Sequence, residues 1–164
     1  LTLEKSDLAP EIVLKLSALL DFILYQSDES TISIHKEIEL LQGFIDLESL
    51  RYGDKLDLVF EHNIDNANTQ IAPLVLLPII ENGSSGNPDH ARIHITLTVV
   101  NLELHFEVHN TKPKIHLLEV DPNKTGIGTI NLKRQLELNY PNKNRLKVED
   151  SLDSYSVKLY LDLK

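Results

Sequence analysis

The chain has 164 residues, of which 41% are hydrophobic, and it carries a formal net charge of −9. This length fits one domain with a full hydrophobic core. The acidic charge argues against nucleic acid as a partner, because neutralising phosphates requires clustered Lys and Arg, and against a basic helix at a membrane surface. The chain has no cysteine, which excludes disulfides and thiolate metal sites and is consistent with a reducing compartment.

The longest apolar run, residues 71–80, is about half as long as a membrane-spanning helix, and no signal peptide is visible. The sequence contains no methionine, so it does not begin at a natural start codon. We therefore expect it to be part of a longer protein, whose other parts can hold membrane spans.

Two helices are predicted in the first third of the chain. Residues 8–27 have apolar side chains at helical spacing, with extra apolar positions that widen the stripe. Two interpretations stay open for this segment: a core helix, or a helix that pairs with a partner helix outside this chain. The second helix is predicted from Ser33, a candidate N-cap, to about Leu50, with Gly53 as a candidate left-handed cap.

The next segments predict a strand, a loop and a buried helix. Residues 56–60 alternate between apolar and mostly polar side chains, which indicates a half-buried strand. Residues 62–70 are polar and predict a loop, and residues 71–82 predict a buried helix. Pro73 suits the first turn of this helix, whereas Pro78 lies further inside and is expected to kink it.

The second half of the chain predicts two pairs of strands around a helix. In chain order these are strands 93–99 and 102–108 with Asn101 near their turn, a loop over 111–125, a helix over 128–140, and strands 146–149 and 155–163. Consecutive strand pairs favour hairpins over parallel crossovers. We therefore predict an α+β fold, a two-layer sandwich with a mixed, largely antiparallel sheet and helices on one face.

An acid and an amide, Glu81 and Asn82, end the apolar helix before a spacer-like Gly-Ser-Ser-Gly at 83–86. Burying a carboxylate without a partner is costly, so this pair is expected at a cleft or at the surface. Glu and Asn oxygens are hard ligands that suit Mg²⁺. An ordinary polar helix terminus is the alternative interpretation.

Gly126 and Gly128 stand before a predicted helix, where free backbone N–H groups can hold phosphate oxygens. A flexible loop end is the alternative. Asn110 ends a predicted strand, and its amide can bond a polar edge of a ligand, although a turn-forming Asn explains it equally. Taken in order, a polar helix tip, a polar strand end, a loop and a Gly-x-Gly helix start can line one nucleotide pocket.

Three segments together resemble the ATP-binding end of sensor histidine kinases of the LytS type. They are EIELLQGFIDLESLRYGD at 37–54, PLVLLPIIEN at 73–82 and GIGTINLKRQLELNYP at 126–141. The resemblance runs along nearly the whole chain. It implies the GHKL (Bergerat) ATPase fold, with residues 1–27 as a remnant of the dimerisation hairpin and residues 28–164 as the ATP-binding catalytic domain.

The resemblance also implies roles for single residues. It makes Asn82 the ligand of Mg²⁺ on the ATP phosphates and Glu81 the catalytic base or water-orienting group. The loop between Asn110 and Gly126 looks like the ATP lid. The other candidate nucleotide-binding residues are Asn110, Gly126, Gly128 and Tyr155. The implied reaction is phosphoryl transfer to a histidine, which depends mostly on positioning and charge neutralisation.

The sequence departs from the family pattern at four points. Residues 83–86 stand where a basic residue and a His usually follow the N box. Asn110 stands near the Asp that reads the adenine amino group, and Tyr155 stands where a Thr often contacts adenine. The phosphoacceptor motif, a His followed by Phe-Leu-Phe-Asn, is absent, so the chain supplies at most the catalytic half of a kinase.

The seven histidines are scattered, and two pairs of them are four residues apart, His90 with His94 and His105 with His109. Along a strand this spacing spans roughly 13 Å, which is too far for one metal. We interpret them as ordinary imidazoles.

As cofactors and partners the resemblance implies ATP, Mg²⁺, the response regulator of the parent kinase and a homodimer through the N-terminal helix. It implies a cytoplasmic domain of a parent protein in the bacterial inner membrane. A catalytically silent module of the same fold, acting through protein–protein contacts, is the alternative, favoured by the missing Asp and by residues 83–86. A chaperone-like or mismatch-repair ATPase fits less well, because the helix before the fold is LytS-like.

Overall fold

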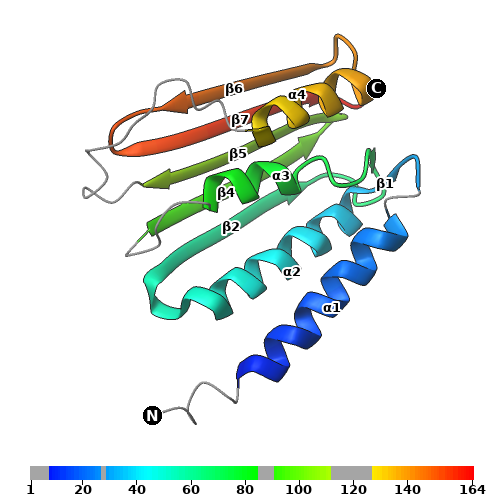
Figure 1. Cartoon of the computed structure of the whole chain (residues 1–164). Helices are drawn as coiled ribbons and strands as arrows, with labels where there is room; N and C mark the ends of the chain where they lie inside the picture. Colours follow the sequence, from blue (N-terminus) through cyan, green and yellow to red (C-terminus); the bar gives the residue numbers. More distant parts are fainter. Residues whose placement is uncertain (1–7, 27–28, 85–90, 112–126) are drawn as a thin grey trace, which may run out of the picture.

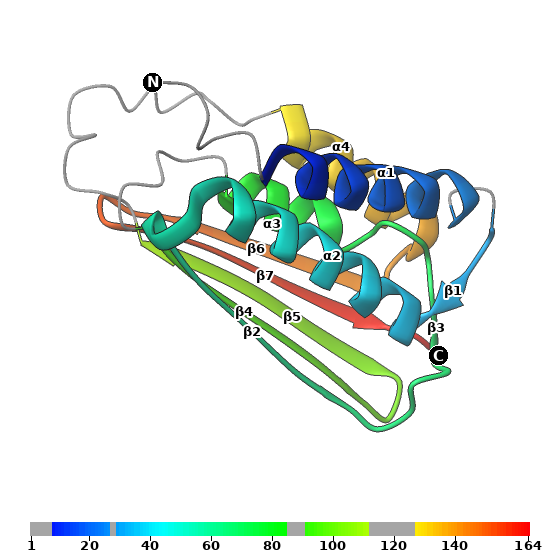
Figure 2. The ribbon, with the colours of Figure 1, turned by 90° about the horizontal axis from the view of Figure 1, so that it is seen from below.

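A computed structural model describes residues 8–26, 29–84, 91–111 and 127–164. A sheet forms one layer, and the helices cover one of its faces (Figures 1 and 2). The helices are α1 (Leu8–Gln26), α2 (Ile34–Tyr52), the 3-10 helix η1 (Gly53–Lys55), α3 (Leu77–Ser84) and α4 (Ile127–Asn139). The strands are β1 (Ile32–Ser33), β2 (Leu56–Ile64), β3 (Gln70–Ile71), β4 (Ala91–Val100), β5 (Glu103–Thr111), β6 (Asn144–Asp150) and β7 (Ser154–Asp162). The predicted two-layer α+β fold is confirmed.

The main sheet has five strands in the order β2-β4-β5-β7-β6, and β1 pairs with β3 in a separate antiparallel ribbon. Only β2 and β4 pair in parallel within the main sheet; its other three pairings are antiparallel. Asn101 and Leu102 join β4 to β5 with positive φ values of 54° and 63°. Two consecutive positive φ values match a type I′ turn, whose twist suits a tight hairpin. The predicted hairpin is therefore confirmed.

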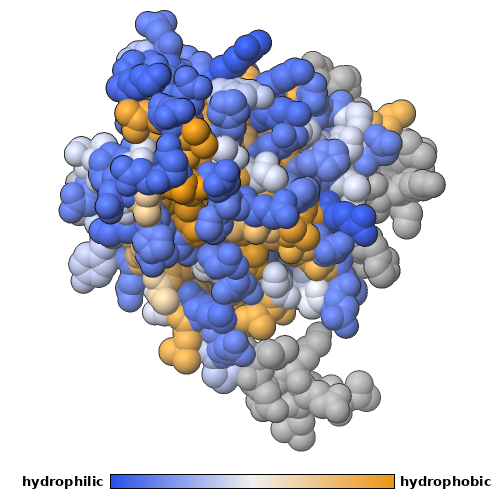
Figure 3. Space-filling view, turned by 180° about the vertical axis from the view of Figure 1, so that it is seen from behind, coloured by the Kyte–Doolittle hydropathy of each residue, from blue (hydrophilic) through white to orange (hydrophobic). Residues whose placement is uncertain are grey.

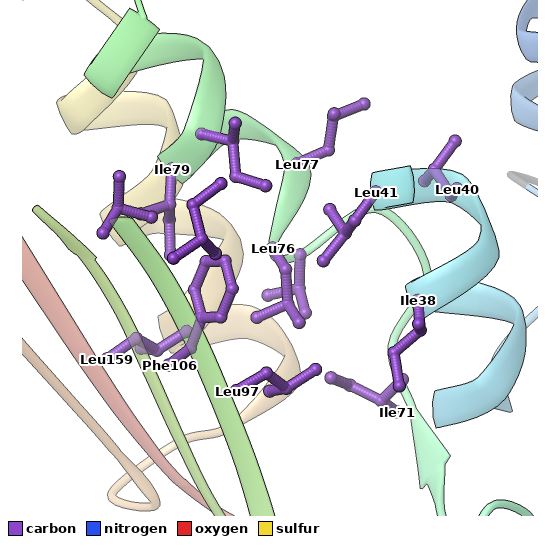
Figure 4. Close-up of a cluster of buried hydrophobic side chains, with 14 of the residues drawn as sticks. Ile38, Leu40, Leu41, Ile71, Leu76, Leu77, Ile79, Leu97, Phe106 and Leu159 are labelled. Atoms are coloured by element: carbon purple, nitrogen blue, oxygen red, sulfur yellow. The ribbon is translucent and has the colours of Figure 1, made fainter. Parts of the chain in front are cut away.

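The core lies between the sheet and α2 and α3. Alternate residues of β4 and β5 point to the helices, and the side chains of Leu97 and Phe106 meet Leu76 and Ile79 there (Figure 4). Ile38 and other apolar residues of α2 close the opposite side of this cluster. Each large side chain buried in this way contributes roughly 1.5–3 kcal/mol of transfer free energy, so the alternation along the strands determines which face the helices cover.

Helix α2 begins at the predicted residue and ends at Tyr52, two residues beyond the predicted end. The hydroxyl of Ser33 accepts a hydrogen bond from the backbone N–H of Lys36 at 3.3 Å, which confirms the N-cap. Gly53 donates its N–H to the carbonyl of Ser49 at the other end. Its φ of 55° is positive, but its ψ of −137° lies outside the left-handed helical region. The cap is therefore a glycine in a conformation that other residues adopt only under strain.

The predicted loop over 62–70 is wrong at its start, because β2 continues to Ile64 in register with β4. Parallel pairing with β4 supplies the backbone partners that keep these polar residues extended. The sequence alone could not indicate this, because the last residues of β2 do not alternate.

The predicted helix over 71–82 is wrong in its first half. Ile71 pairs with Ile32 across the small ribbon, and Leu74 has a φ of 60°, which a helix does not permit. The helix begins only at Leu77, so Pro73 lies outside it. Pro78 lies in its first turn, where no intrahelical N–H partner is required, and the predicted kink has no cause there.

Helix α1 packs mainly against α2 at the edge of the helical layer (Figure 1). Leu19 is buried beside Gly43 of α2, whereas Leu16, Leu20 and Leu24 are exposed. One face of this helix therefore joins the core, whereas another face is open, and pairing with a helix outside this chain stays a prediction. Within the described ranges, no helix has the length and apolar character needed to cross a bilayer.

The face of the sheet away from the helices is mostly hydrophilic (Figure 3). Ion pairs run across its strands, among them Arg92 with Asp57 at 2.9 Å and Lys158 with Glu107 at 3.0 Å. Such exposed pairs contribute little to stability, and this face is a solvated surface.

Candidate functional site

Helix α3, which carries the predicted acid–amide pair, lies over the middle of the sheet. It contacts β5, β7 and β4 below it and α4 beside it. The end of α3, the end of β5 and the start of β7 lie toward the same end of the sheet, on the left in Figure 1. The start of α4 faces the same direction. Segments far apart in the sequence therefore converge at one end of the two layers.

Two of the predicted site residues, Asn110 and Tyr155, are direct cross-strand neighbours on β5 and β7. Asp150 of β6 pairs with Tyr155 on the other side, so the three side chains form a row. The row lies on the helix-covered face, two residues beyond the buried Val108 and Val157. Asn110 and Tyr155 are half-buried. An apolar face that ends in donors and acceptors is suited to the polar edge of a planar ring.

Burial raises the pKa of the Tyr155 phenol, and the Asp150 carboxylate raises it further. The hydroxyl therefore stays protonated at neutral pH and remains available as a donor. Sequence reasoning missed Asp150, because it comes directly after a predicted strand and no spacing distinguishes it from a turn residue.

Glu81 lies in the second half of α3 and is exposed, yet partial desolvation by its neighbours raises the pKa of its carboxyl group. A second acid from α2, Glu48, is only 4% exposed. Burial raises the pKa of Glu48, Arg51 counteracts this increase, and the Glu81 carboxylate adds to it. Arg51 donates from Nη2 to Glu48 Oε2 at 2.9 Å. A raised pKa makes a carboxylate a better proton acceptor near neutral pH.

Glu48 was also missed by sequence reasoning, although Glu48 and Arg51 have the three-residue spacing of a helical ion pair. That spacing indicates an ordinary surface pair. Only the packing of α2 against the rest of the helical layer buries the acid and brings its charge close to that of Glu81.

The donor chemistry of this end fits Mg²⁺ that is bound mainly through phosphates. Among the residues that the structure describes, no group of three or more acidic or histidine side chains is arranged to hold a metal ion by itself. Mg²⁺ commonly takes one or two protein oxygens and fills its remaining positions with water and substrate phosphates. We expect Glu81 and Asn82 of α3 to supply ligands of that kind, which stays a prediction.

Three of the predicted site residues can be placed only in part. The backbone of Asn82 belongs to α3, but its side chain lies outside the described part of the chain. Gly128 lies in the first turn of α4, and Gly126 lies outside the described residues, as do 112–125 of the expected lid. The spacer-like segment begins inside α3, which continues to Ser84. The roles of all these residues stay predictions.

Two of the described histidines, His94 and His105, lie on the open face of the sheet, whereas His62 lies beside the ring of Phe60 on the helix-covered face. His94 contacts Glu61 at 3.0 Å, and His105 packs edge-on against Tyr160 with ring centroids 4.7 Å apart. Both rings lie on the face of the sheet opposite α3. His90 and His116 lie outside the described residues.

The strand order, the helices on one face and the preceding α1 define the class of this fold. It is the GHKL type of α/β sandwich, as found in the catalytic domains of histidine kinases. A family model described as histidine kinase matches residues 1–56. The sensor histidine kinase YpdA of Escherichia coli (strain K12) is 26% identical over 145 residues, which cover 82% of this chain. The chain spans about a quarter of the length of this curated relative, 25%.

Solved structures agree with this class. The nucleotide-free catalytic domain of the histidine kinase ThkA has a TM-score of 0.57 at 13% identity, over 80% of this chain and 94% of that one. ThkA in complex with the response regulator protein TrrA has a TM-score of 0.56 at 15% identity, over 99% of this chain and 52% of that one. At these identities the likeness shows the fold. By sequence and by fold the chain is similar to sensor histidine kinases, which confirms the resemblance found in its sequence.

Proposed function

We propose that this chain is the ATP-binding catalytic domain of a two-component sensor histidine kinase, which transfers the phosphoryl group of ATP to a histidine outside this chain. The observation that carries the proposal is the set of contacts made by α3 with β5, β7 and α4. These contacts support one shared site for the acid–amide pair, the Asn110–Tyr155 row and the first turn of α4.

In this proposal Asn82 binds Mg²⁺, which neutralises charge on the transferred phosphoryl group, and Glu81 accepts or orients a proton. Gly126 and Gly128 free the backbone N–H groups that hold phosphate oxygens. Phosphoryl transfer requires mainly positioning and electrostatic stabilisation, so a small number of well-placed groups suffices.

The adenine end of the proposed site is formed by Asn110 and Tyr155. The amide oxygen of Asn110 can accept a hydrogen bond from the adenine amine, as a carboxylate does, although without its charge. Asp150, next to Tyr155 in the sheet, provides a carboxylate at the same strand ends. The presence of Asp150 weakens the argument from the missing Asp. The absence of that Asp is one of the two features that favour a catalytically silent module.

Titration of the chain with ATP and Mg²⁺ in a calorimeter tests the proposal. We expect Mg²⁺-dependent binding, and Asn82→Ala is expected to remove the Mg²⁺ dependence. No heat of binding at millimolar nucleotide would contradict the proposal and favour the silent module.

A second variant separates a weakened kinase pocket from a module without nucleotide. Asn110→Asp restores the carboxylate of the family pattern beside Tyr155. In a kinase pocket this change is expected to tighten ATP binding, whereas in a module that has lost ATP it changes nothing. Asn101→Asp, at the far end of the same hairpin, is the matched control for the added charge.

The partners follow from the same proposal. ThkA forms a complex with the response regulator TrrA, and we propose that the parent protein of this chain likewise acts on a response regulator. We further propose a homodimer through α1 and a parent protein in the bacterial inner membrane, with this chain as its cytoplasmic domain.

A further inference from the structure

The polypeptide between β3 and α3 is held by a carboxylate from another helix. Glu37 lies in the first turn of α2 and is fully buried. Its Oε2 accepts from the backbone N–H of Leu74 at 3.1 Å, and its Oε1 accepts from the backbone N–H of Leu76 at 3.0 Å. The backbone N–H of Val75 lies close enough to this carboxylate to lower its pKa, which burial raises. Within the described part of the chain, no cationic side chain pairs with Glu37.

The conformation of this segment explains why its N–H groups converge. Leu74 has a φ of 60°, and a left-handed residue in a turn can direct successive N–H groups toward one point. Such a concave arrangement binds an anion. The N–H groups of Leu74 and Leu76 lie outside the strands and helices, so each would lose a hydrogen bond without Glu37.

A second polar contact ties the same segment to α4. The hydroxyl of Tyr140, directly after α4, accepts from the N–H of Ala72 at 2.7 Å. Burial raises the pKa of Tyr140, and the nearby Glu37 carboxylate adds to this increase. One segment of five residues, 72–76, is therefore bonded to both α2 and the end of α4.

Three side chains of this segment, those of Ala72, Val75 and Leu76, are buried. Leu76 is fully buried and points between α2 and the sheet, next to Ile71 and Phe106 (Figure 4). Backbone bonds on one side and apolar packing on the other leave the segment a single orientation. Because α3 begins at Leu77, directly after it, that orientation also sets the axis of α3.

We propose that Glu37 is a positioning residue of the nucleotide site, which acts with Tyr140 by holding the segment 72–76 and thereby aligning α3 with α4. This inference rests on the proposed function, since α3 carries Glu81 and Asn82 and α4 carries Gly128. Glu37 itself touches neither nucleotide nor metal. Its carboxylate provides two acceptor oxygens for the backbone N–H groups of Leu74 and Leu76. A neutral side chain of the same shape, such as glutamine, offers only one acceptor oxygen.

The test compares Glu37→Gln with Ile45→Val, a core change on the same helix that also lowers stability. Gln has the same shape but presents an NH₂ group to one of the donors. Amide hydrogen exchange in the absence of nucleotide is expected to be roughly tenfold faster for Leu74, Leu76 and α3 in Glu37→Gln. The amides of β4 and β5 are expected to match those of Ile45→Val.

Nucleotide binding gives the second readout, measured well below the unfolding temperature of each variant. The dissociation constant of Mg²⁺–ATP is expected to rise roughly tenfold in Glu37→Gln and less than about twofold in Ile45→Val. Tyr140→Phe removes only the hydroxyl that accepts from the N–H of Ala72, and it is expected to raise the dissociation constant by a smaller factor. If Glu37→Gln does not fold, the test is made with Tyr140→Phe.

Equal exchange and equal binding in Glu37→Gln and Ile45→Val would overturn the positioning role and leave Glu37 a structural residue only. Failure of the unaltered chain to bind Mg²⁺–ATP would instead contradict the proposed function. In that case the exchange rates of α3 still decide whether Glu37 aligns this helix.

Discussion

Among single residues, two acids lie close enough in α2 and α3 for the charge on one to affect the other. Glu81 is exposed and is the candidate base, whereas Glu48 is buried and is held by Arg51. A divalent cation or a transferred proton near this pair reduces their repulsion. The electrostatics of these two acids are therefore open to direct measurement.

Glu81→Gln is expected to lower phosphoryl transfer in the full-length parent protein by roughly 10²-fold or more, with little effect on nucleotide binding, because it removes the proposed base. Since desolvation raises the pKa of Glu81, the rate of the unaltered protein is expected to decline with falling pH from a point above the ordinary value of 4.5. Glu61→Gln, on the open face of the sheet, is the control and should retain full rate. Unchanged transfer in Glu81→Gln would remove Glu81 from the mechanism.

Arg51→Met is expected to lower the free energy of unfolding by about 1 kcal/mol at pH 7. The expected loss is small because Arg51 is half-exposed and solvent screens its charge. The folded state holds the proton of Glu48 more tightly than the unfolded state, so the contribution of this acid to stability declines as pH rises from 4.5 through its raised pKa. Without Arg51 this pKa is higher still, and the loss should therefore shrink as pH falls toward 4.5.

Urea denaturation at several pH values measures this dependence. Arg92→Met, which breaks the exposed pair with Asp57, is the control and should change stability by less than about 0.5 kcal/mol. A loss in Arg51→Met that does not vary with pH would show that contacts of Arg51 other than the Glu48 pair, such as the packing of its guanidinium on the Tyr52 ring, stabilise the helix.

Among the elements, two glycines in and directly after α2 lead to opposite expectations. Gly53 ends the helix with a φ of 55°, and a Cβ there would meet no atom within 4 Å. Gly53→Ala is therefore expected to destabilise the chain by about 1–3 kcal/mol through backbone strain alone. Gly43 lies inside the helix, where a Cβ would lie 3.7 Å from Leu19 Cδ1, an ordinary contact.

Gly43→Ala is accordingly expected to stabilise the chain by about 0.5–1 kcal/mol, since alanine loses less backbone entropy in a helix. It also extends into the cavity of about 190 Å³ that Leu19 and Phe22 line between α1 and α2. Urea denaturation of both variants measures whether the free energy of unfolding falls in Gly53→Ala and rises in Gly43→Ala. Destabilisation by Gly43→Ala would mean that α1 and α2 approach more closely than this cavity indicates.

For the molecule as a whole, the open side of α1 is an exposed apolar surface. Val13, Leu16, Leu20 and Leu24 recur at steps of three and four along the helix, so they form one stripe away from α2. Apolar stripes of this kind commonly mark a contact with another protein surface. This stripe is the surface through which we propose the homodimer.

Leu20→Gln is expected to lower the dimer fraction several-fold at a given concentration, because it puts an amide into the middle of the stripe. Leu14→Gln changes a leucine that is 71% exposed, about 120° away around the helix, and is the control. Sedimentation velocity over a concentration series measures both variants. Equal dimer fractions in the two variants, or a monomer at every concentration, would exclude α1 as the interface.

Much of the fold could be predicted from local patterns. The alternation in β4, β5 and β7, the Ser33 cap and the helical spacing of α1 and α2 depend on neighbours in the sequence, and the structure confirms each of them. The segment before α3 could not be predicted, because its conformation depends on Glu37 and Tyr140, which are more than thirty residues away from it.

The candidate site divides in the same way. Residue types at polar ends of elements, such as Glu81, Asn110 and Gly128, could be selected from the sequence, as could the family resemblance that the comparisons confirm. Asp150 and Glu48 could not, because each becomes notable only through strand register or helix packing.

The sequence by itself determined the elements of this protein, the face of each that is apolar and the kind of protein it resembles, since these depend on residue types at short spacing. Only the tertiary structure decided where α3 begins, which acids lie close together and which strand ends meet. Those properties arise from contacts between distant segments, and the type of an apolar or charged residue does not specify which distant residue will bury it.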